Sequence, residues 1–238
     1  PDAIYRARAA LRADIGGKLS PALAEAYESL TVGGPYSPDA AAAGKRALRN
    51  VALDLMAADG NAPAIARAKR QYDAADNMTD RMAALATLSL HETPERDQAL
   101  TDFYKRYAAD ALVIDKWFSL QAMTPRSETL DQVRALTGHA GFSFGNPNRV
   151  RSLIGAFAQA NPTQFNRVDS AGYAFVADTI LTLDPKNPQV AARIATAFRT
   201  WRTLEPKRRS LAEAALRRIK TAPSLSRDVA DIVERALA

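Results

Sequence analysis

Apolar positions recur along most of this chain at the spacing of α-helices. One stripe lies in residues 147–160, at positions i, i+3, i+4 and i+7: Val150, Leu153, Ile154 and Phe157. A second stripe lies in residues 188–203: Val190, Ile194, Ala197, Phe198 and Trp201. Each pattern predicts a helix with one apolar face, and no segment shows the convincing period-two alternation of a strand.

Helix starts are marked by a small polar residue followed by proline. Six such pairs occur: Ser20-Pro21, Ser37-Pro38, Thr93-Pro94, Asn146-Pro147, Asn161-Pro162 and Asn187-Pro188. Four further segments read as turns, the first of them as a helix C-cap and turn between helices: Gly16-Gly17-Lys18, Gly33-Gly34-Pro35, Asp59-Gly60-Asn61 and Asp184-Pro185-Lys186-Asn187. Many helices joined by short loops predict an all-α chain, an irregular α-solenoid or superhelix of stacked antiparallel helix hairpins resembling armadillo or HEAT arrays.

Arginines flank the two apolar stripes. Arg149 and Arg151 fall on the two sides of the first stripe, and Arg193 falls on the edge of the second. Gly155 lies off the first stripe, where a missing side chain permits a close approach of another helix. We therefore expect the three arginines near a boundary between the core and either solvent or a cavity.

Composition narrows the classes of protein. The chain has 238 residues and no cysteine, which excludes a disulfide scaffold and Cys-ligated zinc and is compatible with a reducing, cytoplasmic setting. No apolar run reaches the length of about 18 residues that a membrane span needs, and the start shows no signal-peptide pattern. We expect a cytoplasmic chain with no membrane partner.

Positive charge is concentrated in the C-terminal part. Residues 139–238 hold 15 Lys and Arg against 8 Asp and Glu, a net charge of +7, whereas the whole chain carries +6. Such asymmetry indicates an anionic partner or a positively charged cavity. The stretch 207–220 is strongly basic, but no nucleic-acid-binding motif accompanies it, so a solvated helix face is favoured over nucleic-acid binding.

Independent catalytic chemistry finds no support in the sequence. A zinc peptidase helix needs HExxH, but after His91-Glu92 the position of the second histidine is Glu95, and Pro94 interrupts the pattern. The only other histidine is His139. No cysteine nucleophile, GxSxG elbow or phosphate-binding loop is present. We expect no metal, no cofactor and no active site within the chain itself.

Two polar–aromatic clusters are interpreted as packing elements. Asp76-Asn77-Met78-Thr79-Asp80 reads as a helix start capped by Asn77 or Thr79. Asp115-Lys116-Trp117-Phe118 reads as part of a helix that includes the short run 112–114, with both aromatic rings buried.

These clusters also carry a family resemblance. Four segments occur in the same order and at similar spacing in aminopeptidase N of proteobacteria: YDAADNMTDRMAAL (72–85), LVIDKWFSLQA (112–122), NPNRVRSLIGAFAQANP (146–162) and NPQVAARI (187–194). The chain resembles the C-terminal helical domain of that gluzincin zinc aminopeptidase family over nearly its whole length, most strongly over 72–238. Because the chain lacks HExxH and the family's Gly-Ala-Met-Glu-Asn motif, residues 1–238 are interpreted as a single C-terminal α-superhelical domain of a larger aminopeptidase.

The resemblance implies a function for this domain. In the family the superhelix covers the active site and shapes the channel for peptides, zinc lies in the separate catalytic domain, and positions matching Arg151 and Arg193 face the interior. Arg149 is adjacent to them and is expected either in the same substrate channel or as a cap or bridge between helices. The implied partners are the catalytic domain of the same polypeptide and peptide substrates. The alternative hypothesis is a free-standing α-solenoid scaffold that binds protein or peptide in its concave groove.

Overall fold

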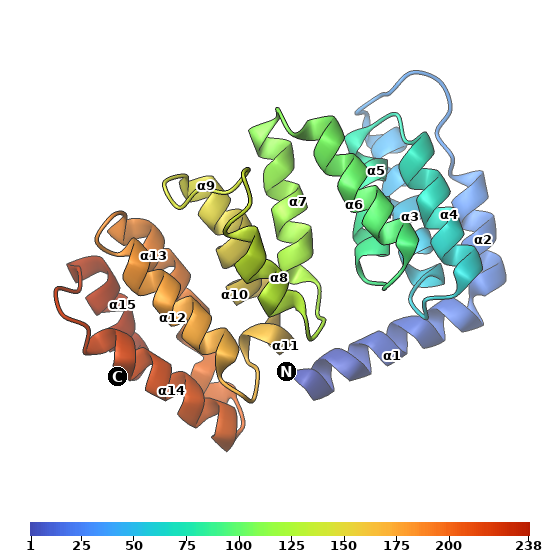
Figure 1. Ribbon diagram of the computed structural model, residues 1–238. Helices are drawn as coiled ribbons and strands as arrows, with labels where there is room; N and C mark the ends of the chain where they lie inside the picture. The colour runs from blue at the N-terminus through green and yellow to red at the C-terminus, as the bar shows by residue number, and fades with distance from the viewer. The chain divides into compact units, whose positions relative to one another are not determined.

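Every regular element of the molecule is a helix (Figure 1). The computed structural model describes all residues, 1–238. The helices pack into two compact units, which are described separately: an N-terminal unit of residues 3–106, and a C-terminal unit of residues 1–2 and 107–238. The all-α expectation is confirmed, and the assignment of residues 1–238 to a single domain of a larger enzyme stays a prediction.

The N-terminal unit holds the first six helices: α1 (Asp2–Lys18), α2 (Ser20–Ser29), α3 (Ala40–Met56), α4 (Ala62–Ala74), α5 (Met78–Ser89) and α6 (Pro94–Tyr107). Consecutive helices pair, α2 with α3 and α4 with α5, and α3 also packs on α5. Their core contains the fully buried side chains of Leu53, Tyr72, Leu85 and Phe103.

Two predicted boundaries in this unit are wrong. Gly16 and Gly17 lie within the last turn of α1 instead of a turn between helices. A methyl group on Gly16 would lie 2.1 Å from the carbonyl oxygen of Leu55, so this glycine serves close helix packing. The Ser37-Pro38 pair does not start a helix either, because Asp39 is the N-cap and its carboxylate accepts from the amide of Ala42 at 2.9 Å.

The C-terminal unit holds the remaining elements: α7 (Ala111–Met123), α8 (Thr129–Leu136), α9 (Pro147–Val150), the π-helix η1 (Arg151–Gly155), α10 (Ala156–Ala160), α11 (Pro162–Phe165), α12 (Ala171–Leu183), α13 (Pro188–Ala195), the 3₁₀-helix η2 (Thr196–Thr203), α14 (Pro206–Lys220) and α15 (Arg227–Leu237). Helix α7 packs on η1 and α10, and α13 packs on α12, α15 and η1 (Figure 1). Edge-to-face aromatic pairs, such as Phe157 with Phe175 at 5.7 Å, fill this core.

Both apolar stripes face the core of this unit, but neither segment is a uniform α-helix. Residues 147–160 form one continuous helical rod in which η1 interrupts the α geometry. Residues 188–203 begin as α13 and continue as the 3₁₀-helix η2. Of the nine stripe positions named by the sequence, Ala197 is half-buried and the other eight are buried: Val150, Leu153, Ile154, Phe157, Val190, Ile194, Phe198 and Trp201.

The asparagine caps are confirmed. Asn77, Asn146, Asn161 and Asn187 each accept a hydrogen bond from a backbone amide of the first turn that follows. Their side chains satisfy amides that have no partner inside the helix, which fixes where each rod starts. No helix of the molecule has the length and apolar character needed to cross a membrane.

Candidate functional site

The buried arginine of the predicted site is Arg149. It lies in the first turn of α9, where Asn146 accepts from its backbone amide at 3.3 Å. Its side chain turns to α7, and Nη1 donates to Asp115 Oδ1 at 2.9 Å and to the carbonyl of Ala111 at 3.3 Å. The guanidinium also lies 5.2 Å from the centre of the Phe118 ring. With 7% of its surface exposed, Arg149 bridges two helices and has no free face for a ligand.

Arg151 has the opposite environment. It is the first residue of η1 and is exposed to solvent. Its guanidinium donates to the side-chain oxygen of Asn148 but forms no ion pair. Most of its five N–H donors are therefore free to bind an anion.

Arg193 is also exposed, in the last turn of α13, and forms no ion pair. Its carbonyl accepts from the hydroxyl of Thr196 at 2.7 Å and from Gln159 Nε2 at 3.4 Å. The second of these bonds joins α13 to α10, so the backbone of Arg193 is held against the rod that carries Arg151.

Gly155 marks the place where these two elements meet. A methyl group at this position would lie 3.6 Å from Ile194 Cδ1 and 3.8 Å from Arg151 Cβ. Both are ordinary van der Waals distances, so the glycine is not required by the approach of α13. We call the place where η1 packs on α13, at the buried Gly155 and Ile194, the η1–α13 seam; Arg151 belongs to the first element and Arg193 to the second. The structure thus places the exposed Arg151 and Arg193 on two elements that pack on each other, η1 and α13, and turns the side chain of Arg149 to α7.

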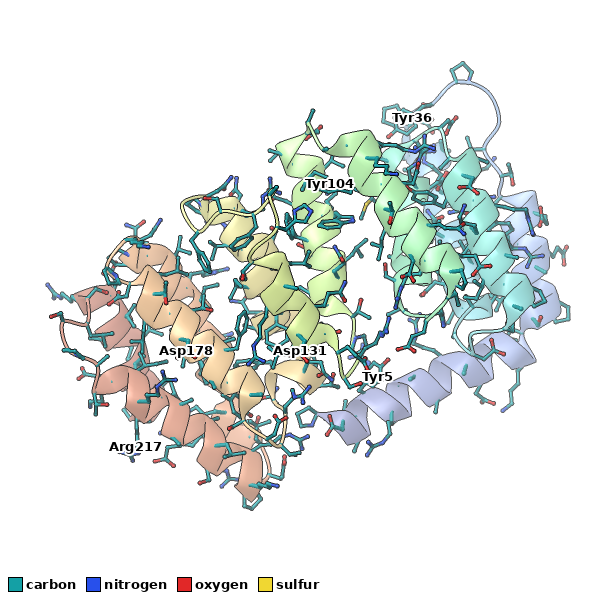
Figure 2. All side chains as sticks on the ribbon, in the orientation of Figure 1. Tyr5, Tyr36, Tyr104, Asp131, Asp178 and Arg217 are labelled. Carbon is teal, nitrogen blue, oxygen red and sulfur yellow. The ribbon has the colours of Figure 1, made fainter.

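The basic stretch 207–220 carries far less free charge than its sequence indicates. Arg208 is buried and paired with Asp2 and Glu205, and Arg217 pairs with Glu213 at 2.6 Å. Figure 2 labels Arg217 on α14 and Asp178 on α12, and Asp178 pairs with Arg218. Lys220 lies 3.6 Å from Glu234. Because most of the basic side chains are paired with carboxylates, little unpaired positive charge remains to bind the phosphate backbone of a nucleic acid.

An open pocket of about 230 Å³ lies elsewhere in the C-terminal unit. Its lining includes Arg167, Asp169 and Arg208, whose charges are already paired. The hydrogen bond from Arg167 lowers the pKa of Asp169 to about 2, against the opposing effect of burial. A pocket whose charged side chains are already paired with one another has little to attract an ionic ligand.

No cluster of three or more His, Cys, Asp or Glu side chains is arranged to hold a metal ion. His91 belongs to the N-terminal unit, where burial lowers its pKa. His139 belongs to the C-terminal unit and packs against the rings of Trp117 and Phe118. Neither histidine is set in a group of potential metal ligands.

The π-helix is the feature of this site that the sequence did not reveal. Its buried Ser152 donates to Asp115 Oδ1 at 3.1 Å, and its carbonyl accepts from Ser119 Oγ of α7 at 2.8 Å. The sequence reads as an uninterrupted amphipathic helix here, and a contact with a residue 33 positions away leaves no local signal.

Comparison with known proteins agrees with this architecture. The family model described as "Domain of unknown function (DUF3458_C) ARM repeats" matches residues 1–238, which confirms the α-solenoid expectation. "Aminopeptidase N" of Caulobacter vibrioides is 39% identical over 237 residues, covering 100% of this chain and 28% of the relative. "Aminopeptidase N" of Escherichia coli is 35% identical over 238 residues, covering 100% of this chain and 27% of the relative.

A solved structure gives the same result. A crystal structure of Legionella pneumophila aminopeptidase A in complex with aspartic acid superposes with a TM-score of 0.89 at 27% identity. The superposed region includes 98% of this chain and 28% of the Legionella pneumophila chain. The resemblance to bacterial aminopeptidase N is confirmed, and this chain spans little more than a quarter of the length of the relatives it matches.

Proposed function

We propose that this chain is the non-catalytic C-terminal domain of a zinc aminopeptidase N. The chain belongs to the family described as "Domain of unknown function (DUF3458_C) ARM repeats". The proposal is supported by the sequence identity of 35–39% with three proteins named "Aminopeptidase N". This chain covers only 27–28% of the length of each of them. The remaining length of such a polypeptide would carry the catalytic domain, and zinc would be bound there.

In this role the helices close over the active site and shape the channel through which peptides enter. Steric closure of this kind restricts substrates to short or unfolded peptides. We place the enzyme in the cytoplasm, with which a cysteine-free chain is compatible. The 238-residue chain by itself should show no aminopeptidase activity, with or without added zinc. Measurable hydrolysis of an aminoacyl arylamide by the purified chain would contradict this part of the proposal.

The observation that carries the binding proposal is the η1–α13 seam, where Arg151 and Arg193 are exposed and unpaired. A peptide bound by its amino end at the catalytic zinc still carries a C-terminal carboxylate. An arginine matches a carboxylate with two parallel N–H donors and gives up its hydration more readily than lysine. We assign Arg151 and Arg193 to binding that carboxylate, and Arg149 to bridging α9 and α7.

The test uses the full-length enzyme and two kinds of substrate. Arg151→Ala, Arg193→Ala and the double variant are compared on Ala-Ala, which has a carboxylate, and on alanine p-nitroanilide, which has none. Loss of a charge-assisted hydrogen bond should raise KM for Ala-Ala about tenfold and change KM for the anilide less than about twofold.

Arg217→Ala is the matched control, because it removes one exposed arginine from α14 and leaves the seam intact. It should leave both KM values unchanged. Equal increases in KM for both substrates in the seam variants would refute carboxylate binding, since the anilide has no carboxylate to lose.

A further inference from the structure

The π-helix leaves one backbone carbonyl without its usual partner. In an α-helix the amide of residue 156 would donate to the carbonyl of residue 152. Here the amide of Ala156 donates to the carbonyls of Arg151 and Leu153 instead. The buried Ser152 carbonyl thus loses its α-helical donor, and a donor from a neighbouring helix can take that place.

Ser119 supplies that donor from the neighbouring helix α7. Its Oγ lies 2.8 Å from the carbonyl oxygen of Ser152 and 3.0 Å from the carbonyl oxygen of Asp115, one turn earlier in α7. A serine hydroxyl has one hydrogen, and the shorter of these contacts reaches the carbonyl that the π-helix releases. A hydroxyl donor at this carbonyl favours η1, in which the α-helical donor is absent, over a regular α-helix.

The position of η1 decides how Arg151 is presented. A π turn takes one residue more than an α turn, so it changes the rotation between the residues on its two sides by roughly 100°. Arg151 opens the π-helix, and Gly155 closes it against Ile194 of α13. Without η1, Arg151 would leave the rod in a different direction relative to the η1–α13 seam.

We propose that Ser119 is a positioning residue for peptide substrates that carry a free C-terminal carboxylate. It holds the carbonyl of Ser152, this bond keeps residues 151–155 in the π conformation, and the π conformation directs Arg151 toward the substrate carboxylate. The proposal rests on the carboxylate-binding role of Arg151 given above. Ser119 itself touches no substrate.

The experiment compares four variants of the full-length enzyme on Ala-Ala and alanine p-nitroanilide. They are Ser119→Ala, Ser119→Thr, Arg151→Ala, and the double variant Ser119→Ala/Arg151→Ala. Ser119→Ala should raise KM for Ala-Ala about threefold or more, with kcat and the KM for the anilide unchanged. Ser119→Thr keeps the hydroxyl and should restore the KM. In the Arg151→Ala background, Ser119→Ala should add nothing, because it acts through Arg151.

Ser89→Ala is the matched control. Ser89 on α5 also donates to the carbonyl four residues earlier, Leu85, at 2.7 Å, but it has no bond to another helix. Its removal should leave the ratio of the two KM values unchanged.

Each result separates the two proposals. If Arg151→Ala loses the preference for Ala-Ala while Ser119→Ala keeps it, the positioning role is overturned and the proposed function stands. If both variants keep the preference, the carboxylate-binding function fails and the positioning role fails with it. If Ser119→Ala raises KM equally with and without Arg151, Ser119 acts by another route and the proposal is overturned.

Discussion

The inner and outer faces of the rod 147–160 place two arginines in opposite situations. The inner face is buried, and there Arg149 is paired with Asp115 and stacked on Phe118. The outer face is exposed, and there Arg151 forms no ion pair. Only two positions separate these residues in the sequence. Residue type is therefore a poor guide to a binding role, whereas burial and prior pairing discriminate clearly.

Burial explains why an arginine on the inner face stabilises the fold, whereas an arginine on the outer face is available to bind an anion. A buried arginine must be paired and hydrogen-bonded, because leaving its charge unpaired in the interior is costly. Once paired it has no attraction left for a ligand. An exposed arginine adds little to stability, and its free donors can bind an anion when a neighbouring domain excludes water.

The largest expected effect is on the inner face, from Phe157→Ala. Phe157 is fully buried and packs edge-to-face on Phe175 at 5.7 Å. Removing the ring leaves a cavity, and the free energy of unfolding of the 238-residue chain should fall by about 3–5 kcal/mol. Urea denaturation followed by circular dichroism measures this. A loss below about 1 kcal/mol would show that the inner face is not the packed core described above.

Arg149→Ala should be the next most damaging change, with a loss of about 3 kcal/mol. The reason is that Asp115, with 18% of its side chain exposed, would be left without its cation. The double variant Arg149→Met/Asp115→Leu removes both charges and should recover most of the loss, because no unpaired ion remains. Equal destabilisation by the single and double variants in urea titrations would argue against an unpaired carboxylate as the cause.

Gly155→Ala sharpens the boundary between the two faces. The added methyl group meets Ile194 at an ordinary distance of 3.6 Å, so stability should be unchanged or should rise by up to about 1 kcal/mol. Gly172→Ala is the contrasting control, since its methyl group would lie 2.3 Å from the carbonyl oxygen of Phe165. That overlap should destabilise by about 1–3 kcal/mol. In thermal unfolding measured side by side, the melting temperature should fall for Gly172→Ala. It should stay the same or rise for Gly155→Ala.

Arg151→Ala should have the smallest effect on folding. The side chain is exposed and unpaired, so the free energy of unfolding should change by no more than about 0.5 kcal/mol. The same substitution should have the largest effect on the KM for dipeptides. A destabilisation comparable to that of Arg149→Ala would remove the distinction between the two faces.

Local features of the fold were predictable from the sequence. The asparagine caps at Asn146, Asn161 and Asn187 and the apolar stripes depend on residues within one or two turns, and the structure agrees with them. Features that depend on distant partners were not predictable. The glycine pair at Gly16 predicts a turn, but the structure uses this glycine for close packing against the carbonyl of Leu55, which lies on another helix.

The candidate site follows the same rule. The sequence placed Arg149, Arg151 and Arg193 at stripe edges, but pairing with Asp115 separates the first from the other two. The π-helix and the hydrogen bond that its Ser152 carbonyl accepts from Ser119 leave no trace in the spacing of apolar residues. The basic stretch 207–220 looked strongly charged because its acidic partners, Asp178 and Glu234, come from other helices.

The most direct test of the central claim is a crystal structure of the full-length enzyme with a bound, non-hydrolysable dipeptide analogue. The account predicts zinc outside residues 1–238 and a substrate carboxylate oxygen about 2.7–2.9 Å from a guanidinium nitrogen of Arg151 or Arg193. Arg149 should remain bonded to Asp115. A carboxylate held only by groups outside residues 1–238, with Arg151 and Arg193 facing bulk solvent, would contradict the account.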